Sequence, residues 1–127
     1  MAETVMDSSA VLASIRGEPG ADVVNAALAG SFTSAINLAE VVSKLIQDGV
    51  PGAEAATIVR RIGVQLVETD EEQALAASLI HAITRSAGIS IGDAFCLALG
   101  KLRGCPVMTA DRAWKTLDLG VEVTLIR

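Results

Sequence analysis

The chain has 127 residues, enough for one domain with a core of its own; 51% are hydrophobic, 20% are charged, and the formal net charge is −5. Despite a mean hydropathy of +0.50, polar residues interrupt every stretch of membrane-spanning length, and the acidic start "MAETVMDSS" lacks the apolar segment of a signal peptide. We therefore expect a soluble, cytoplasmic protein with no membrane contact, and the apolar excess predicts that a second copy or another protein covers part of its surface.

Periodicity and capping residues predict short apolar strands that alternate with helices. In chain order we expect strand 4–7, helices 8–16 and 21–30, strand 31–34, helices 35–49 and 51–63, strand 64–69, helices 71–88 and 90–102, strand 106–110, helix 111–117 and strand 121–126. Asp70 and Gln73 have the spacing of a capping box. The alternation is typical of a parallel sheet with helices on both faces, so we predict one α/β domain spanning residues 1–127.

Three acids stand where strands end or a helix begins. Asp7 follows the first strand and Asp111 follows strand 106–110, while Asp93 lies in the first turn of the apolar helix "ISIGDAFCLALGKL". Ligand sites in such folds lie beyond the carboxyl ends of the strands, so these carboxylates are expected at one edge of the sheet. Close carboxylates repel one another unless a cation lies between them, and at least one should then have a raised pKa. Ligands that offer only oxygen suit Mg²⁺ or Mn²⁺.

Each of these acids also has a purely structural interpretation. Asp7 and Asp111 have the position of a helix N-cap, and Asp93 has the capping-box spacing with Ser90. Caps are commoner than catalytic acids, so each residue taken singly favours the structural interpretation. The convergence of the three favours a site.

Periodicity gives Glu40 no functional role. The apolar residues of helix 35–49 place Glu40 nearly opposite the buried face, with Lys44 at the spacing of a surface ion pair. Asn37, one turn earlier, is likewise expected to be solvated.

The remaining chemistry-bearing residues have structural interpretations. Cys96 and Cys105 lack the spacing of a zinc site and are expected to be small buried hydrophobes. His81 is the single histidine and Trp114 the single tryptophan, and we expect no catalytic role for either.

Four segments together resemble the PIN domain family, and within it the short VapC-type toxins: "VMDSSAVLA", "NLAEVVSKL", "ISIGDAFCLAL" and "VMTADRAWKTL", in that order. The resemblance implies a single-domain α/β/α sandwich whose central parallel sheet carries an acidic pocket that binds Mg²⁺ or Mn²⁺. It implies that the catalytic and metal-binding residues are Asp7, Glu40, Asp93 and Asp111. It also implies that Ser9 and Thr109 orient the carboxylates or the metal-bound water.

The same resemblance implies a metal-dependent endoribonuclease, the toxin of a type II toxin–antitoxin pair. Its water-based hydrolysis would leave a 5′-phosphate and a 3′-hydroxyl. The implied partners are an RNA substrate, a cognate antitoxin protein and a second copy in a homodimer. Setting aside the four acids leaves a net charge of −1 rather than −5, which removes much of the apparent conflict with RNA binding.

Three other functions share some of these features. A non-catalytic PIN-like interaction module would not need an unpaired acid inside an apolar helix. A PIN nuclease in RNA processing would share the chemistry but not the antitoxin. A phosphoacceptor or phosphatase domain would also place an aspartate after the first strand, but "DSS" lacks the second acid of those motifs.

Overall fold

A five-stranded parallel sheet forms the centre of the computed structural model, which describes residues 2–127. The strand order is β3-β2-β1-β4-β5, and every neighbouring pair is parallel. The strands are β1 (Thr4–Met6), β2 (Ser31–Ser34), β3 (Gln65–Val67), β4 (Val107–Thr109) and β5 (Val123–Leu125). The expected order of elements and the parallel sheet are confirmed.

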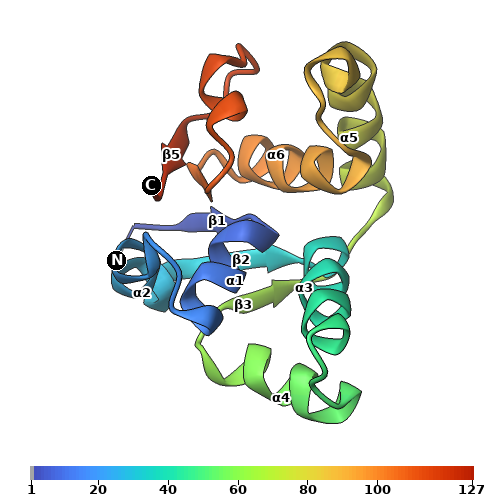
Figure 1. Cartoon of the computed structure of the whole chain (residues 1–127). Coiled ribbons are helices and arrows are strands. Elements are labelled where there is room, and N and C mark those ends of the chain that lie inside the picture. Colours follow the sequence, from blue (N-terminus) through green and yellow to red (C-terminus); the bar gives the residue numbers. More distant parts are fainter. Residues whose placement is uncertain (1) are drawn as a thin grey trace.

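Helices cover both faces of the sheet (Figure 1). They are α1 (Ser8–Arg16), α2 (Ala21–Ala27), α3 (Ala35–Gln47), α4 (Gly52–Arg61), α5 (Glu71–Thr84) and α6 (Ile91–Arg103). Three short 3-10 helices are η1 (Leu28–Gly30), η2 (Arg85–Ala87) and η3 (Arg112–Thr116). Two of them continue α2 and α5, which end earlier than predicted, and η3 replaces the predicted helix 111–117. None of the helices in residues 2–127 has the length and apolar character needed to cross a membrane.

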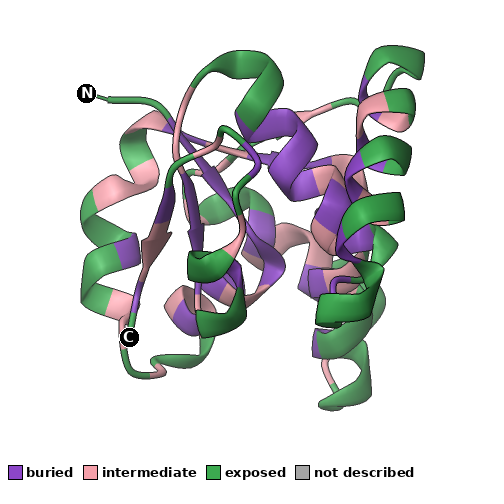
Figure 2. Ribbon diagram, turned by 90° about the horizontal axis from the view of Figure 1, so that it is seen from above, coloured by how far each residue is buried: buried purple, intermediate pink, exposed green. Residues whose placement is uncertain are grey.

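The sheet separates two hydrophobic cores, as the alternation of side chains along a strand requires. Val5 and Val107 point into the core beneath α5, α6 and η3, whereas Met6 and Met108 point into the core beneath α1 to α4. Figure 2 shows the buried residues on the strands and on the inward sides of the helices. Trp114 is fully buried in the first core, which confirms its expected structural role.

Side-chain caps begin three of the α-helices. Ser34 caps α3, Asp70 caps α5, and Ser90 caps α6. The capping box expected from Asp70 and Gln73 is only half formed: Asp70 accepts from the backbone N–H of Gln73, but the Gln73 amide donates instead to the Glu68 carbonyl at 2.9 Å.

Candidate active site

The pairing of β1 with β4 brings Asp7 and Thr109 together at the carboxyl edge of the sheet. The Asp7 backbone N–H donates to the carbonyl of Met108 at 3.0 Å, and the Asp7 side chain is buried. Two hydroxyls donate to the same carboxylate oxygen, Asp7 Oδ2: that of Ser9 at 2.6 Å and that of Thr109 at 2.9 Å. The residues expected to orient a carboxylate thus contact Asp7, and they hold one oxygen while Oδ1 faces the opposite way, toward Ser8.

Burial raises the pKa of Asp7 above its ordinary value. The hydrogen bonds from Ser9 and Thr109 act in the opposite direction because they favour the charged carboxylate. The nearby negative charge of Asp93 adds to the increase. The expectation that at least one acid of the cluster has a raised pKa is therefore confirmed, and the residue is Asp7.

Glu40 lies beside Asp7, so the prediction of a solvated surface residue from periodicity is wrong. Its side chain is half-buried, and Asn37 Nδ2 donates to Glu40 Oε1 at 2.8 Å. The hydroxyl of Ser8, at the start of α1, lies 3.3 Å from Glu40 Oε1 and 3.5 Å from Asp7 Oδ1. One hydroxyl therefore stands between the two carboxylates and can donate to either.

Asn37, likewise expected to be solvated, is fully buried. It is held from three sides: the Ser34 hydroxyl donates to its Oδ1 at 2.7 Å, and its Nδ2 donates to Glu40 and, at 3.1 Å, to the carbonyl of Gly92 in α6. Asn37 thus ties the Glu40 carboxylate to the first turn of the helix that carries Asp93.

Both residues were wrongly predicted to be solvated because the side of α3 that faces inward differs from the side that hydropathy indicates. The buried residues of α3 are Asn37, Val41 and Leu45, a row with a spacing of four, whereas Ile46 is 48% exposed. A polar residue inside this row shifts the apparent apolar face by about one position. The spacing of Asn37 from the N-cap Ser34 and from Glu40 was the signal available in the sequence.

Asp93 combines the two interpretations that the sequence left open. Its Oδ2 accepts from the backbone N–H of Ser90 at 3.0 Å, and its own N–H donates to the Ser90 hydroxyl at 3.1 Å, which completes a capping box. The same side chain is half-buried and close enough to raise the pKa of Asp7. The cap fixes Asp93 in place, and its negative charge is felt at the buried carboxylate.

Asp111 is the acid that the fold leaves outermost. Its side chain is exposed and caps η3 by accepting from the N–H of Ala113 at 3.0 Å. Its backbone N–H donates to the hydroxyl of Thr109 at 3.1 Å, and this hydroxyl in turn donates to Asp7. Asp111 is therefore linked to the cluster through Thr109 rather than by direct contact.

The buried thiol of Cys96 shows which acids share one region. Burial raises its pKa well above the ordinary value, and the negative charges of Asp7, Asp93 and Glu40, in that order, raise it further. The charge of Asp111 is not among those that raise the pKa of Cys96. Both cysteines are free; Cys96 is fully buried, as expected, and Cys105 is half-buried.

The donor set fits a divalent cation only in part. Within residues 2–127, no three His, Cys, Asp or Glu side chains converge closely enough to hold a metal ion. Mg²⁺ in proteins, however, often binds one or two carboxylates and completes its shell with water and substrate phosphate. Asp7 and Glu40 flank a single hydroxyl and meet that requirement. The residues present fit an ion held by these two acids with Asp93 nearby, and they do not form a closed set of four carboxylates.

The approach of Glu40 to α6 requires glycine at position 92. A Cβ atom added to Gly92 would overlap with Glu40 Oε2, much closer than real Cβ atoms come to another atom. We expect Gly92→Ala to fold normally, because alanine favours the helix and Glu40 is a flexible side chain. The carboxylate should move away from Asp7, so that the RNA cleavage implied by the family resemblance falls by about ten- to a hundred-fold.

Cleavage rates and melting curves of Gly92→Ala and Gly52→Ala check this expectation. Gly52 is the matched control, because its nearest neighbour would be 3.7 Å from an added Cβ. Wild-type cleavage by Gly92→Ala would show that the position of Glu40 is unimportant.

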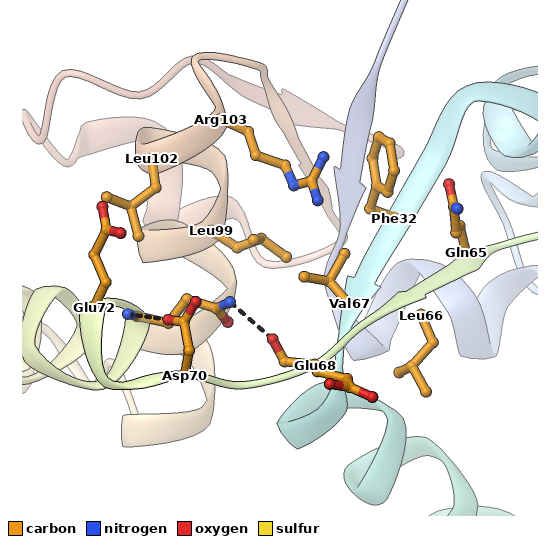
Figure 3. A pocket seen from close by; sticks show the side chains of 11 residues that line it. Phe32, Gln65, Leu66, Val67, Glu68, Asp70, Glu72, Leu99, Leu102 and Arg103 are labelled. Atoms are coloured by element: carbon orange, nitrogen blue, oxygen red, sulfur yellow. Dashed lines mark hydrogen bonds between the residues drawn. The ribbon is translucent and has the colours of Figure 1, made fainter.

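A hollow elsewhere on the molecule is separate from these acids. It has a volume of about 550 Å³ and lies where β2 and β3 meet the start of α5 and the end of α6. Figure 3 shows Arg103 above the ring of Phe32, at 4.3 Å from its centroid, on one wall of this hollow. Asp7, Glu40, Asp93 and Asp111 do not line it. The acidic cluster at the strand ends is therefore distinct from this hollow.

The sequence matches the family model described as "PIN domain" over residues 4–119. A ribonuclease VapC of Mycolicibacterium smegmatis is 30% identical to it, in an alignment that covers 91% of this chain and 96% of that protein.

Solved structures share the fold at lower identity. The DNA-bound VapBC of Salmonella typhimurium has a TM-score of 0.77 at 16% identity, with both chains fully covered. VapC20 of Mycobacterium tuberculosis, a sarcin–ricin loop cleaving toxin, has a TM-score of 0.67 at 17% identity, over 94% of this chain and 98% of that one. At these identities the likeness shows the fold alone, an α/β/α sandwich with a central parallel sheet.

Proposed function

The chain belongs to the PIN domain family, and from this premise we propose that it is a metal-dependent endoribonuclease, the toxin of a type II toxin–antitoxin pair. Its similarity to a ribonuclease VapC along nearly the whole length supports the activity. The observation that carries the proposal is the buried carboxylate of Asp7, which has Glu40 and Asp93 beside it. Within residues 2–127, the ion pairs join Arg16 and Arg127 to other acids, and none involves this cluster.

A buried carboxylate with other acids beside it and no basic partner is costly for the fold alone. A structural role would be served by caps and would not require Asp7 to be buried. The cost is understandable if a cation binds there in the active protein. A bound Mg²⁺ or Mn²⁺ would supply Lewis acidity toward the phosphodiester and make a water more acidic.

The side chains of the protein then provide preorganisation. Ser9 and Thr109 hold Asp7 Oδ2, so that Oδ1 is presented toward Ser8 and Glu40. Asn37 holds Glu40 Oε1, and the capping box holds Asp93. Because these groups are already in place, little reorganisation is required when the substrate phosphate arrives.

Attack by water, with a 5′-phosphate and a 3′-hydroxyl as products, is the outcome that we propose. The alternative, attack by the ribose 2′-hydroxyl, uses a pair of proton-transferring groups such as two histidines, and His81 is the single histidine of the sequence. His81 lies on α5 and not among the acids at the strand ends.

The proposed partners are a structured RNA, an antitoxin protein and a second copy of the chain. The structures of similar fold include VapBC complexes, which supports the antitoxin. Only 2% of the residues are aromatic, so base stacking can contribute little, and selectivity would come from the shape and backbone of the RNA.

The test is cleavage of a structured RNA by the purified chain with EDTA, with Mg²⁺ and with Mn²⁺. We expect internal cleavage that requires the metal and leaves ends that a ligase can use as 5′-phosphates. Absence of cleavage with either metal would favour the non-catalytic PIN-like module. If the chain cleaves RNA but cells that produce it without any antitoxin grow normally, a role in RNA processing would be favoured instead.

A further inference from the structure

The hollow beside Phe32 and Arg103 lies over the outer part of the sheet, at the edge strand β3. The side chains of Gln65 and Val67 share one face of β3, and Val67 packs against the core beneath α5 and α6. Phe32, the register partner of Gln65 on β2, lies on the same face. α6 packs across this face over β1, β2 and β4, and the hollow of about 550 Å³ opens beside it. The floor of the hollow is therefore sheet surface, with α6 and the start of α5 as its walls.

The middle of the hollow is apolar. Val67 forms part of its floor, and Leu99 and Leu102 of α6 form one wall. Leu102 is 43% exposed, so a molecule lying against it would remove apolar surface from water. The volume is within the range of small-molecule sites in proteins. These features favour a ligand with a short aliphatic stem.

A buried acceptor in the wall of the hollow has no hydrogen bond. Gln73 lines the hollow and is 5% exposed, and its Nε2 donates to the carbonyl of Glu68 at 2.9 Å. This bond fixes which end of the amide carries the oxygen. Gln73 Oε1 is then left buried and without a partner among residues 2–127. Such an atom is costly for the fold, and an N–H group of a ligand in the hollow would remove the cost.

Carboxylates accompany this acceptor. Glu68, Asp70 and Glu72 line the same hollow, and the ion pairs found within residues 2–127 neutralise none of the three. The described side chains do not converge closely enough to hold a metal ion here. An ammonium group carries a positive charge and three donors, so it can serve carboxylates and the Gln73 amide oxygen together. This end of the hollow favours an organic ammonium.

A positive charge lies at another side of the hollow. The guanidinium of Arg103 lies over the ring of Phe32, and Figure 3 shows it separated from Asp70 and Glu72. Arg103 makes no ion pair with an acid of the described chain. The contact with the ring holds the guanidinium by its flat face, so the N–H groups in its plane remain available. Two parallel hydrogen bonds from such a plane are the usual way in which arginine binds a carboxylate.

We propose that the hollow binds a small zwitterion with a terminal ammonium, a short aliphatic stem and a carboxylate, the chemical class of the ω-amino acids and the basic amino acids. The ammonium lies with Glu72 and Gln73 Oε1, the stem covers the apolar middle, and the carboxylate lies on Arg103. The site is separate from the acids at the strand ends. Binding requires neither RNA nor a metal ion, so the proposal does not depend on the nuclease chemistry.

Titration of the ¹⁵N-labelled full chain with 6-aminohexanoate, followed by nuclear magnetic resonance in EDTA, tests the site. The charges of the hollow face solvent, so we expect a Kd on the order of 1 mM. The side-chain amide signals of Gln73 and the backbone signals of residues 65–73 and 99–103 should shift and saturate together. Pentylamine and hexanoate, which each lack one charged end, should bind about five-fold more weakly or less. No saturable shift at about ten times the expected Kd would overturn the proposal.

Matched substitutions separate the site from general charge attraction. Glu72→Gln and Arg103→Gln should each weaken 6-aminohexanoate by about five-fold. Glu71→Gln and Lys101→Gln make the same changes of charge on the same two helices, and these residues are exposed and do not line the hollow. Both controls should bind like the wild type. Equal effects within each pair would show attraction by net charge only and would overturn the proposal.

Discussion

Asp7→Asn is expected to reduce the RNA cleavage rate by at least about a hundred-fold, more than the ten- to hundred-fold typical of a supporting residue around a metal site. The substitution removes the negative charge at the centre of the cluster without changing the volume of the side chain. The amide oxygen of asparagine can still accept from Ser9 and Thr109, which contact a single oxygen of Asp7. The fold should therefore persist, and the loss should be one of activity.

The other acids provide a graded comparison. Glu40→Gln and Asp93→Asn should also reduce cleavage strongly, because both charges lie in the region shared with Asp7. Asp111→Asn should have the smallest effect of the four, since Asp111 is exposed and linked to Asp7 only through Thr109. Single-turnover cleavage rates, with circular dichroism as the control for folding, check the order. Unchanged cleavage by any variant would remove its residue from the proposed site.

The second large effect concerns stability without metal. In EDTA at neutral pH, Asp7→Asn should be more stable than the wild type by about 1 to 3 kcal/mol, because it replaces a buried charge with a neutral group that keeps its hydrogen bonds. Asp93→Asn should change stability little, since its amide oxygen can still accept from the N–H of Ser90. The buried position of Asp7 makes Asp7, and not Asp93, the residue whose charge costs most.

The dependence on pH follows from the raised pKa of Asp7. The folded chain binds this proton more tightly than the unfolded chain does. The associated stability is fully present below the ordinary pKa of an aspartate and is lost as the pH rises through the raised value. The advantage of Asp7→Asn in EDTA should therefore shrink under acidic conditions. Urea unfolding of both proteins at acidic and neutral pH measures it, and an advantage independent of pH would contradict the burial of a charge as its cause.

Bound metal should reverse the order of stability of the wild type and Asp7→Asn. A ligand that binds only the folded state stabilises it by mass action, so Mg²⁺ or Mn²⁺ should raise the melting temperature of the wild type. Asp7→Asn should lose most of that increase. Melting curves with EDTA and with Mn²⁺ provide the comparison, and equal increases for both proteins would place the cation elsewhere.

Local features of the sequence determined the order of the elements and much of the site. A helix cap depends on residues within one turn, which is why Ser90 with Asp93 and the cap by Asp70 could be predicted from spacing alone. The position of Asp7 after a strand is equally local. Once the sheet is parallel, that position also fixes the edge at which the side chain emerges.

The tertiary structure alone decided which side of each helix faces inward. Glu40 and Asn37 enter the site because α3 packs against α1 and α6, and Gly92 leaves room for the approaching carboxylate. Likewise, Asp111 points outward because η3 begins directly after it. The hydropathy of one segment cannot report these contacts, since they depend on residues that are distant in the chain. The resemblance to a family pointed to Glu40, and the packing of α3 supplied the physical reason for its position.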